Sequence, residues 1–270
     1  MSGFSAEWLA LREGADHAAR NGDVARAAAA LLAGKKPARI IDLGAGAGSN
    51  FRGFSPLIDA PQVWTLVDHE ARLLAAAREK ITPLLAGQTR IAVDYAQVDL
   101  MRDVELLLAR GCDLVTAAAF FDLASEAWIA RFCAALAERR LPLYAILSYD
   151  GVEHWRPPHA LDARILAAFA KHQATDKGFG PAAGPRAHGV LRDALARHGY
   201  SVMEGASPWR LSGDQRALMR QLAQGIAAAA QESGEISAAE ASAWRAAREA
   251  ATGCDIGHLD LLAAPGVAGT

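Results

Sequence analysis

The chain has 270 residues, of which 52% are hydrophobic and 21% are charged, and its formal net charge is −2. This length accommodates one α/β domain with additions, and so small a charge gives no overall field that would attract nucleic acid or an anionic membrane. Cys112, Cys133 and Cys254 are too scattered for a metal motif or a disulfide framework, so we expect no metal. The sequence has neither a secretory signal nor an apolar run of the ~20 residues that span a bilayer, so we expect a cytoplasmic protein.

The first predicted element is helical. Ser5 can cap a helix from about residue 6 to residue 33, interrupted near Gly14 or Gly22. Arg12, Asp16 and Arg20 recur every four residues and therefore share one face of this helix. This spacing is typical of a solvated ion-pair stripe; the alternative is that residues 1–36 form a helical lid over a ligand.

A glycine-rich turn follows the first predicted strand. Residues 38–43 form a short apolar run that contains Asp42, and Gly44, Gly46 and Gly48 follow at alternate positions. Glycines allow a sharp turn and bring backbone N–H groups close to a ligand. A dinucleotide-binding fingerprint would need its third glycine at position 49, which is Ser, so the pattern argues against a nicotinamide-dependent oxidoreductase.

A second predicted strand, residues 63–68, ends in Asp68 about 20 residues beyond the glycines. The acid, the alternating glycines and this second acid together resemble the class I S-adenosylmethionine (SAM)-dependent methyltransferases. The resemblance implies a doubly wound α/β fold with a mostly parallel seven-stranded sheet. Its strand order would be 3-2-1-4-5-7-6, with strand 7 antiparallel, and residues 37–270 would form this domain.

The resemblance also implies SAM as cofactor, with S-adenosylhomocysteine as product. Asp42 and the three glycines would border it, Asp68 would bind the ribose, and Arg20 on the lid would pair with the methionine carboxylate. A third strand over residues 91–98 leads to Asp99 and Leu100, which would bind the adenine; Asp94 competes with Asp99 but lies inside the strand pattern. A fourth strand over residues 113–119 leads to residues that would border the methyl group, among them Ala117 and Phe120.

The acceptor side is less defined. After a helix over residues 126–140 and a fifth strand over residues 141–149, residues 150–159 read as a loop, and we expect an ordered substrate lid over about residues 150–188. The alternative is a structural connection with solvated side chains. The candidate catalytic residues are Asp122, Tyr149, His154, His159 and His172. The candidate substrate-binding residues are Phe121, Trp155, Asp176, Lys177 and Trp209, although the aromatic ones could equally be core residues.

The C-terminal part predicts a helix over residues 187–198, a sixth strand over residues 200–204 and a last strand over residues 257–264. Between the last two strands, helical patterns over residues 213–231 and 237–251 indicate an insertion at about 207–252. This insertion would close over the site or mediate dimerisation, so we expect a monomer or a homodimer.

These observations favour methyl transfer to a small polar molecule by in-line displacement. The segment after the fourth strand lacks the Asn/Asp-Pro-Pro-Tyr pattern used on base amino groups, and no basic module is evident for an RNA or protein substrate. A catalytically silent SAM-binding protein remains an alternative. The acceptor atom stays open, because the fold does not fix the substrate.

Overall fold

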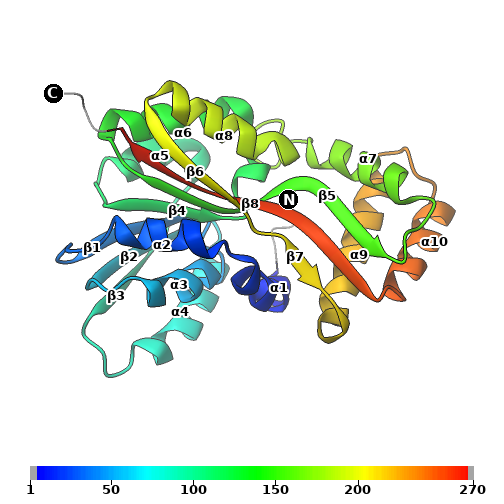
Figure 1. The fold of residues 1–270 in the computed structure, drawn as a ribbon, viewed down its shortest axis with the longest axis horizontal. Helices are drawn as coiled ribbons and strands as arrows, with labels where there is room; N and C mark the ends of the chain where they lie inside the picture. The colour runs from blue at the N-terminus through cyan, green and yellow to red at the C-terminus, as the bar shows by residue number, and fades with distance from the viewer. Residues whose placement is uncertain (1–4, 267–270) are drawn as a thin grey trace.

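A computed structural model describes residues 5–266, whose central feature is an eight-stranded sheet (Figure 1). Its order is β3-β2-β1-β4-β5-β8-β6, and β7 pairs with β8 beside this path. The strands are β1 (Ala38–Leu43), β2 (Gln62–Asp68), β3 (Ile91–Gln97), β4 (Leu114–Ala118), β5 (Leu143–Arg156), β6 (Tyr200–Ala206), β7 (Trp209–Leu211) and β8 (Gly253–Pro265). The pairs among β1 to β5 are parallel and those of β8 are antiparallel, which confirms the predicted α/β fold and strand order.

Helices cover both faces of the sheet. The α-helices are α1 (Ala6–Ala19), α2 (Gly22–Ala30), α3 (Ser49–Phe54), α4 (Ala71–Leu85), α5 (Leu100–Leu108), α6 (Glu126–Arg139), α7 (Asp162–Gln173), α8 (Ala187–Arg197), α9 (Arg216–Glu232) and α10 (Ala238–Glu249). Short 3-10 helices are η1 (Ser55–Leu57), η2 (Phe121–Leu123), η3 (Gly184–Arg186) and η4 (Gly213–Gln215). The apolar residues of α2, α3 and α4 form one core layer with the sheet, and those of α5, α6 and α8 form the other.

The N-terminal helical region divides into two parts with different packing. Asn21 caps α2 through its side chain and its N–H donates to Asp260 Oδ2 at 2.8 Å, so the chain breaks at Arg20 and Asn21 rather than at Gly14. Val24 and other residues of α2 lie in the core against β1. Only α1 lies across the carboxyl ends of the strands, where its contacts are mainly with β7 (Figure 1).

The fifth strand does not end where the sequence predicted. β5 continues to Arg156 and pairs with β8 as far as Gly253, with register shifts after Ala145 and after Tyr149. The prediction of a loop over residues 150–159 was therefore wrong for residues 150–156, because the long β8 supplies backbone partners that local sequence patterns do not reveal.

The extended β5–β8 ribbon supports a helical lobe of α7, α9 and α10, at the right of Figure 1. Its core contains Trp155 of β5 and Trp244 of α10, and the buried Arg248 guanidinium lies 5.7 Å from each ring. Arg248 Nη1 also donates to the Pro157 carbonyl at 2.8 Å. Within residues 5–266, no helix has both the length and the apolar character needed to cross a membrane.

Candidate active site

The glycine loop lies at the carboxyl end of β1, between β1 and α3. Gly44, Gly46 and Gly48 have φ angles of 60°, 53° and 77°, in the left-handed region that favours glycine. The Gly46 N–H donates to Asp68 Oδ2 at 2.9 Å, which fixes the loop against the end of β2. The sequence thus places three conformationally demanding glycines at the edge of the sheet where parallel α/β folds bind ligands.

Asp42 is a buried carboxyl beneath this loop. Its Oδ1 accepts from Asn50 Nδ2 at 2.8 Å, whereas Oδ2 is buried without a hydrogen-bond partner in the described part of the chain. The pKa of Asp42 is raised from 3.8 to about 7, mainly by burial and to a smaller extent by the nearby Asp68. The hydrogen bond from Asn50 and the positive charge of Arg20 oppose this rise. An unmatched acceptor at a ligand-binding edge is suited to a bound donor.

Arg20, at the end of α1, connects to the same network. Its Nη2 donates to Asn50 Oδ1 at 2.9 Å and its Nη1 to Tyr144 Oη at 3.3 Å. Its Nε is buried and has no hydrogen-bond partner among residues 5–266. The network therefore has an unmatched donor as well as an unmatched acceptor.

Asp68, the predicted ribose ligand, is 5% exposed at the end of β2. Its Oδ1 accepts from the Glu70 N–H and its Oδ2 from the Gly46 N–H, both at 2.9 Å. Each carboxylate oxygen has two lone pairs, so Asp68 retains acceptor capacity after these two bonds.

The ends of β3 and β4 carry the other predicted cofactor residues. Asp99 is the exposed N-cap of α5, and its Oδ1 accepts from the Met101 N–H at 3.0 Å. Leu100 is buried and its carbonyl accepts from Trp128 Nε1. Ala117 lies in the core of the sheet, and Asp94 lies within β3 rather than at its end.

Two side chains close the glycine loop in this structure. A Cβ on Gly44 would lie 2.7 Å from the Phe120 ring, and a Cβ on Gly46 would lie 3.0 Å from a methyl of Leu9 on α1. A ligand that approaches the loop from the side where a Cβ would lie therefore needs Phe120 and Leu9 to move.

A second group of polar residues comes from the segment after β4 and from the middle of β5 and β8. Asp122 follows β4, and its Oδ1 is shielded from solvent without a hydrogen-bond partner in the described residues. Burial raises the pKa of Asp122 to about 6, opposed by its own backbone N–H and by the charge of Arg12. Tyr149 of β5 lies opposite His258 of β8, and its hydroxyl donates to Glu153 Oε1 at 3.1 Å.

Arg12 and His258 also belong to this group, although neither was predicted from the sequence to be functional. Arg12 was interpreted as part of a solvated stripe, but its guanidinium lies 5.0 Å from the Trp209 ring and its side chain is only 12% exposed. His258 fell inside the predicted last strand, where a lone histidine carries no motif. The four-residue spacing of Arg12 and Asp16 predicted that the two side chains would meet, and they do form a salt bridge at 2.9 Å.

Trp209, a predicted substrate residue, lies within this group. Its Nε1 donates to Asp16 Oδ1 at 3.1 Å, and its ring centre is 5.1 Å from that of His258.

The other candidate histidines lie elsewhere. His154 is exposed on β5 opposite Asp255, and His172 of α7 contacts Glu232 of α9 at 3.1 Å. His159 Nδ1 accepts from the Leu161 N–H before α7. His154 thus lies on the extension of β5, and the partners of His159 and His172 belong to the segment before α7 and to α9.

The remaining predicted substrate residues have structural contacts of their own. Phe121 is a core residue packed against Phe132, and Trp155 Nε1 donates to Glu153 inside the helical lobe. Asp176 accepts from the N–H groups of Gly178 and Gly180, and Lys177 donates to Thr175, all within one turn.

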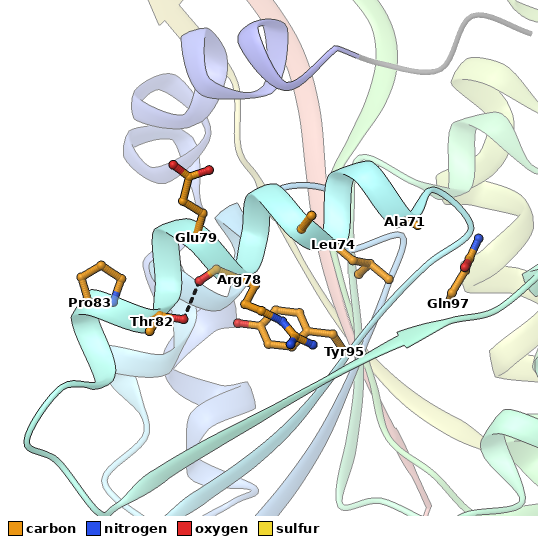
Figure 2. A pocket seen from close by; sticks show the side chains of 9 residues that line it. Ala71, Leu74, Arg78, Glu79, Thr82, Pro83, Tyr95 and Gln97 are labelled. Atoms are coloured by element: carbon orange, nitrogen blue, oxygen red, sulfur yellow. Dashed lines mark hydrogen bonds between the residues drawn. The ribbon is translucent and has the colours of Figure 1, made fainter.

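A hollow of about 720 Å3 lies between α4 and β3 (Figure 2). In Figure 2 the Arg78 side chain lies over the Tyr95 ring, at 4.7 Å from its centre, and Leu74 and Gln97 line the other end. Because Arg78 already covers the Tyr95 ring, this hollow does not present an open aromatic face.

No protein-family model matches the chain, and no curated protein matches it. Among solved structures, the YcgJ protein of Bacillus subtilis aligns over 92% of this chain and 100% of its own, with 10% identity and a TM-score of 0.50. The cyclopropane synthase MmaA2 of Mycobacterium tuberculosis aligns over 88% and 82%, with 12% identity and a TM-score of 0.49. A putative methyltransferase of Bacillus halodurans aligns over 91% and 100%, with 13% identity and a TM-score of 0.49. With its strand order and antiparallel β8, the chain has the fold of the class I SAM-dependent methyltransferases.

Proposed function

We propose that this protein transfers a methyl group from SAM to a small-molecule acceptor. The observation that supports the proposal is the combination of a glycine loop with three positive φ angles and a buried carboxyl, Asp42, with one unmatched oxygen. Both lie at the carboxyl edge of the sheet, where doubly wound folds bind their ligands.

The unmatched groups near the loop fit the methionine end of SAM. That end carries an ammonium and a carboxylate, and the site has an unmatched acceptor, Asp42 Oδ2, and an unmatched donor, Arg20 Nε. An ammonium beside Asp42 would favour the ionised carboxylate, whose pKa is raised to about 7 in the absence of such a partner. Asp42 and Arg20 would therefore hold the methionine end.

Asp68 would accept hydrogen bonds from the ribose hydroxyls, using the lone pairs that the Gly46 and Glu70 N–H groups leave. Asp99 and Leu100 would contact the adenine from the start of α5. Phe120 and Leu9 would leave the glycines and form part of the wall around the bound cofactor.

When bound, SAM supplies an activated methyl group, so the residues of this chain have to position the acceptor and receive its proton. Asp122 is suited to the second task, because its Oδ1 is unmatched and burial raises its pKa to about 6. A carboxyl with a pKa near the working pH is an effective general base.

Calorimetric titration of the purified protein tests the proposal with SAM, S-adenosylhomocysteine and NADH as separate ligands. We expect binding of the two adenosyl compounds and none of NADH. An Asp42→Asn variant should bind S-adenosylhomocysteine about tenfold more weakly or worse, whereas Asp59→Asn, at an exposed position, should bind it as wild type does. Absence of adenosyl binding by folded, ligand-free protein would refute the proposed function.

A further inference from the structure

Five residues are joined by side-chain contacts, and a sixth, Asp122, interacts electrostatically with Arg12. We call this group the Arg12 cluster: Arg12, Asp16, Asp122, Tyr149, Trp209 and His258. They come from α1, from the segment after β4, and from β5, β7 and β8. The Trp209 and His258 ring centres are 5.1 Å apart, and those of His258 and Tyr149 are 6.0 Å apart. The three rings therefore make a continuous aromatic wall.

The Arg12 guanidinium lies against this wall. Arg12 Nε and Nη2 donate to the two carboxylate oxygens of Asp16 at 2.9 and 3.1 Å, so within residues 5–266 Nη1 is left without a hydrogen-bond partner. The guanidinium carbon lies 5.0 Å from the Trp209 ring. The charge of Arg12 opposes the burial that raises the pKa of Asp122, and it adds to the burial that lowers the pKa of His258. Arg12 thus has one free donor nitrogen within electrostatic reach of Asp122, a partly exposed residue whose Oδ1 is shielded from solvent.

His258 adds an acceptor but no charge. Its Nδ1 lies 3.1 Å from the Ile256 carbonyl, so Nδ1 carries the proton and Nε2 keeps its lone pair. Burial, helped by Arg12, lowers the pKa of His258 to about 3, so the ring is neutral at physiological pH. Nε2 has no hydrogen-bond partner in the described structure.

We propose that the Arg12 cluster is the acceptor end of the site and selects a planar acceptor with an acidic, phenol-type hydroxyl, whose proton passes to Asp122 while Arg12 Nη1 holds the resulting oxyanion. The proposal rests on the proposed function. In the proton transfer the O–H bond of the acceptor breaks, its electron pair stays on oxygen, and Asp122 becomes a neutral carboxylic acid. His258 Nε2 would accept from a second donor on the same acceptor.

The cluster disfavours amine acceptors. The face of Trp209 that could attract a cationic ligand is already covered by the Arg12 guanidinium. A protonated amine would also be repelled by Arg12, because a like charge disfavours the charged form of a ligand.

Aliphatic alcohols are a poor match to Asp122. A carboxyl with a pKa of about 6 can take a proton from a phenol, whose ordinary pKa is about 10, once a cation stabilises the phenolate. The hydroxyl of an alcohol is far less acidic, so the same base and cation would leave it un-ionised.

Two probes test the proposal by binding, without turnover. Para-nitrophenol changes its absorption spectrum on ionisation, and para-nitrobenzylamine is a cationic compound of similar shape. With protein saturated in S-adenosylhomocysteine, at a pH below the pKa of the free phenol, we expect bound para-nitrophenol to be ionised about tenfold more than the free compound. We expect no detectable binding of para-nitrobenzylamine.

Variants separate the roles. Arg12→Met should abolish the extra ionisation of bound para-nitrophenol, and Arg12→Lys should retain part of it. Asp122→Asn should bind para-nitrophenol, but this variant lacks the carboxylate that accepts the proton. Arg26→Met is the matched control, because Arg26 is a 70% exposed arginine on the adjacent α2, paired with Asp23. If Arg12→Met does not fold, the Lys and Asp122→Asn variants still carry the test.

The outcomes distinguish the two proposals. If S-adenosylhomocysteine does not bind, the proposed function fails. If it binds but para-nitrophenol does not bind, binds without extra ionisation, or is ionised equally in Arg12→Met, the assignment of the acceptor is wrong and the proposed function stands. Preferential binding of para-nitrobenzylamine would also overturn it.

Discussion

The carboxyl of Asp42 should destabilise the fold at neutral pH, and replacing it with asparagine should reveal by how much. Asp42 is 0% exposed, and burial raises its pKa from 3.8 to about 7. At about 1.4 kcal/mol per pKa unit, a rise of about three units corresponds to about 4 kcal/mol, which is an upper bound for the penalty on the ionised form. Asparagine keeps an oxygen that can accept from Asn50 Nδ2 but carries no charge.

The sign of this effect depends on pH. Because the pKa of Asp42 is higher in the folded state than in the unfolded state, the folded state binds the proton more tightly. The penalty is therefore absent below about pH 4 and grows as the pH rises to about 7. We expect Asp42→Asn to match the wild type near pH 4 and to exceed it by at least about 1 kcal/mol near pH 8.

Urea unfolding of both proteins over this pH range measures the difference directly. Asp122 and Glu153, whose pKa values are also raised by burial, are present in both proteins and cancel in the comparison. Asp59→Asn, at an exposed position, should differ from wild type by less than about 0.5 kcal/mol throughout. A constant difference across the pH range, or an Asp42→Asn variant that is less stable at every pH, would refute the reasoning.

Three further predictions concern the cofactor site and the helical lobe. Asp68→Asn should weaken S-adenosylhomocysteine binding about tenfold or more in calorimetry, because one carboxylate oxygen becomes a donor beside the Gly46 N–H; unchanged affinity would contradict the ribose assignment. Gly48→Ala should lower the free energy of unfolding by about 2–4 kcal/mol, because φ is 77° and a Cβ would lie 2.8 Å from Ile81 Cδ1. Arg248→Met should lower it by about 3 kcal/mol, since the Pro157 carbonyl loses its donor and Asp162 loses an ion-pair partner at 3.8 Å. The helices α7, α9 and α10 should then become more sensitive to protease than the sheet.

The sequence was sufficient to predict most strands of the sheet, because these strands are short apolar runs bounded by turn residues and such signals are local. The strand order and the antiparallel last strand came from the family resemblance, and both are confirmed. The two helices before the last strand are also present, and Ser237 and Glu240 form the capping box that their spacing predicted. The extension of β5 to Arg156 was missed, because its partner in β8 is distant in sequence and the residues beyond Tyr149 show no strand pattern of their own.

The two halves of the candidate site also differ in how far local sequence signals predict them. The cofactor half depends on glycines whose backbone angles are a local requirement, so the motif around Asp42 was readable from the sequence. The acceptor half joins residues of α1, β7 and β8, and only tertiary packing brings them together. Arg12 looked like a solvated residue because its helical neighbour Asp16 satisfies its charge, although both side chains are at most 12% exposed.

One helix joins these halves. Leu9 of α1 covers Gly46 on the cofactor side, and Arg12, one turn later, lies over Trp209 on the acceptor side. Residues three apart share a face of a helix, so a movement of α1 as a unit that takes Leu9 off the glycine loop must also shift the Arg12 guanidinium. The position of the cation against the aromatic wall therefore depends on what occupies the glycine loop, which makes the adenosyl-bound protein the correct state in which to study the acceptor.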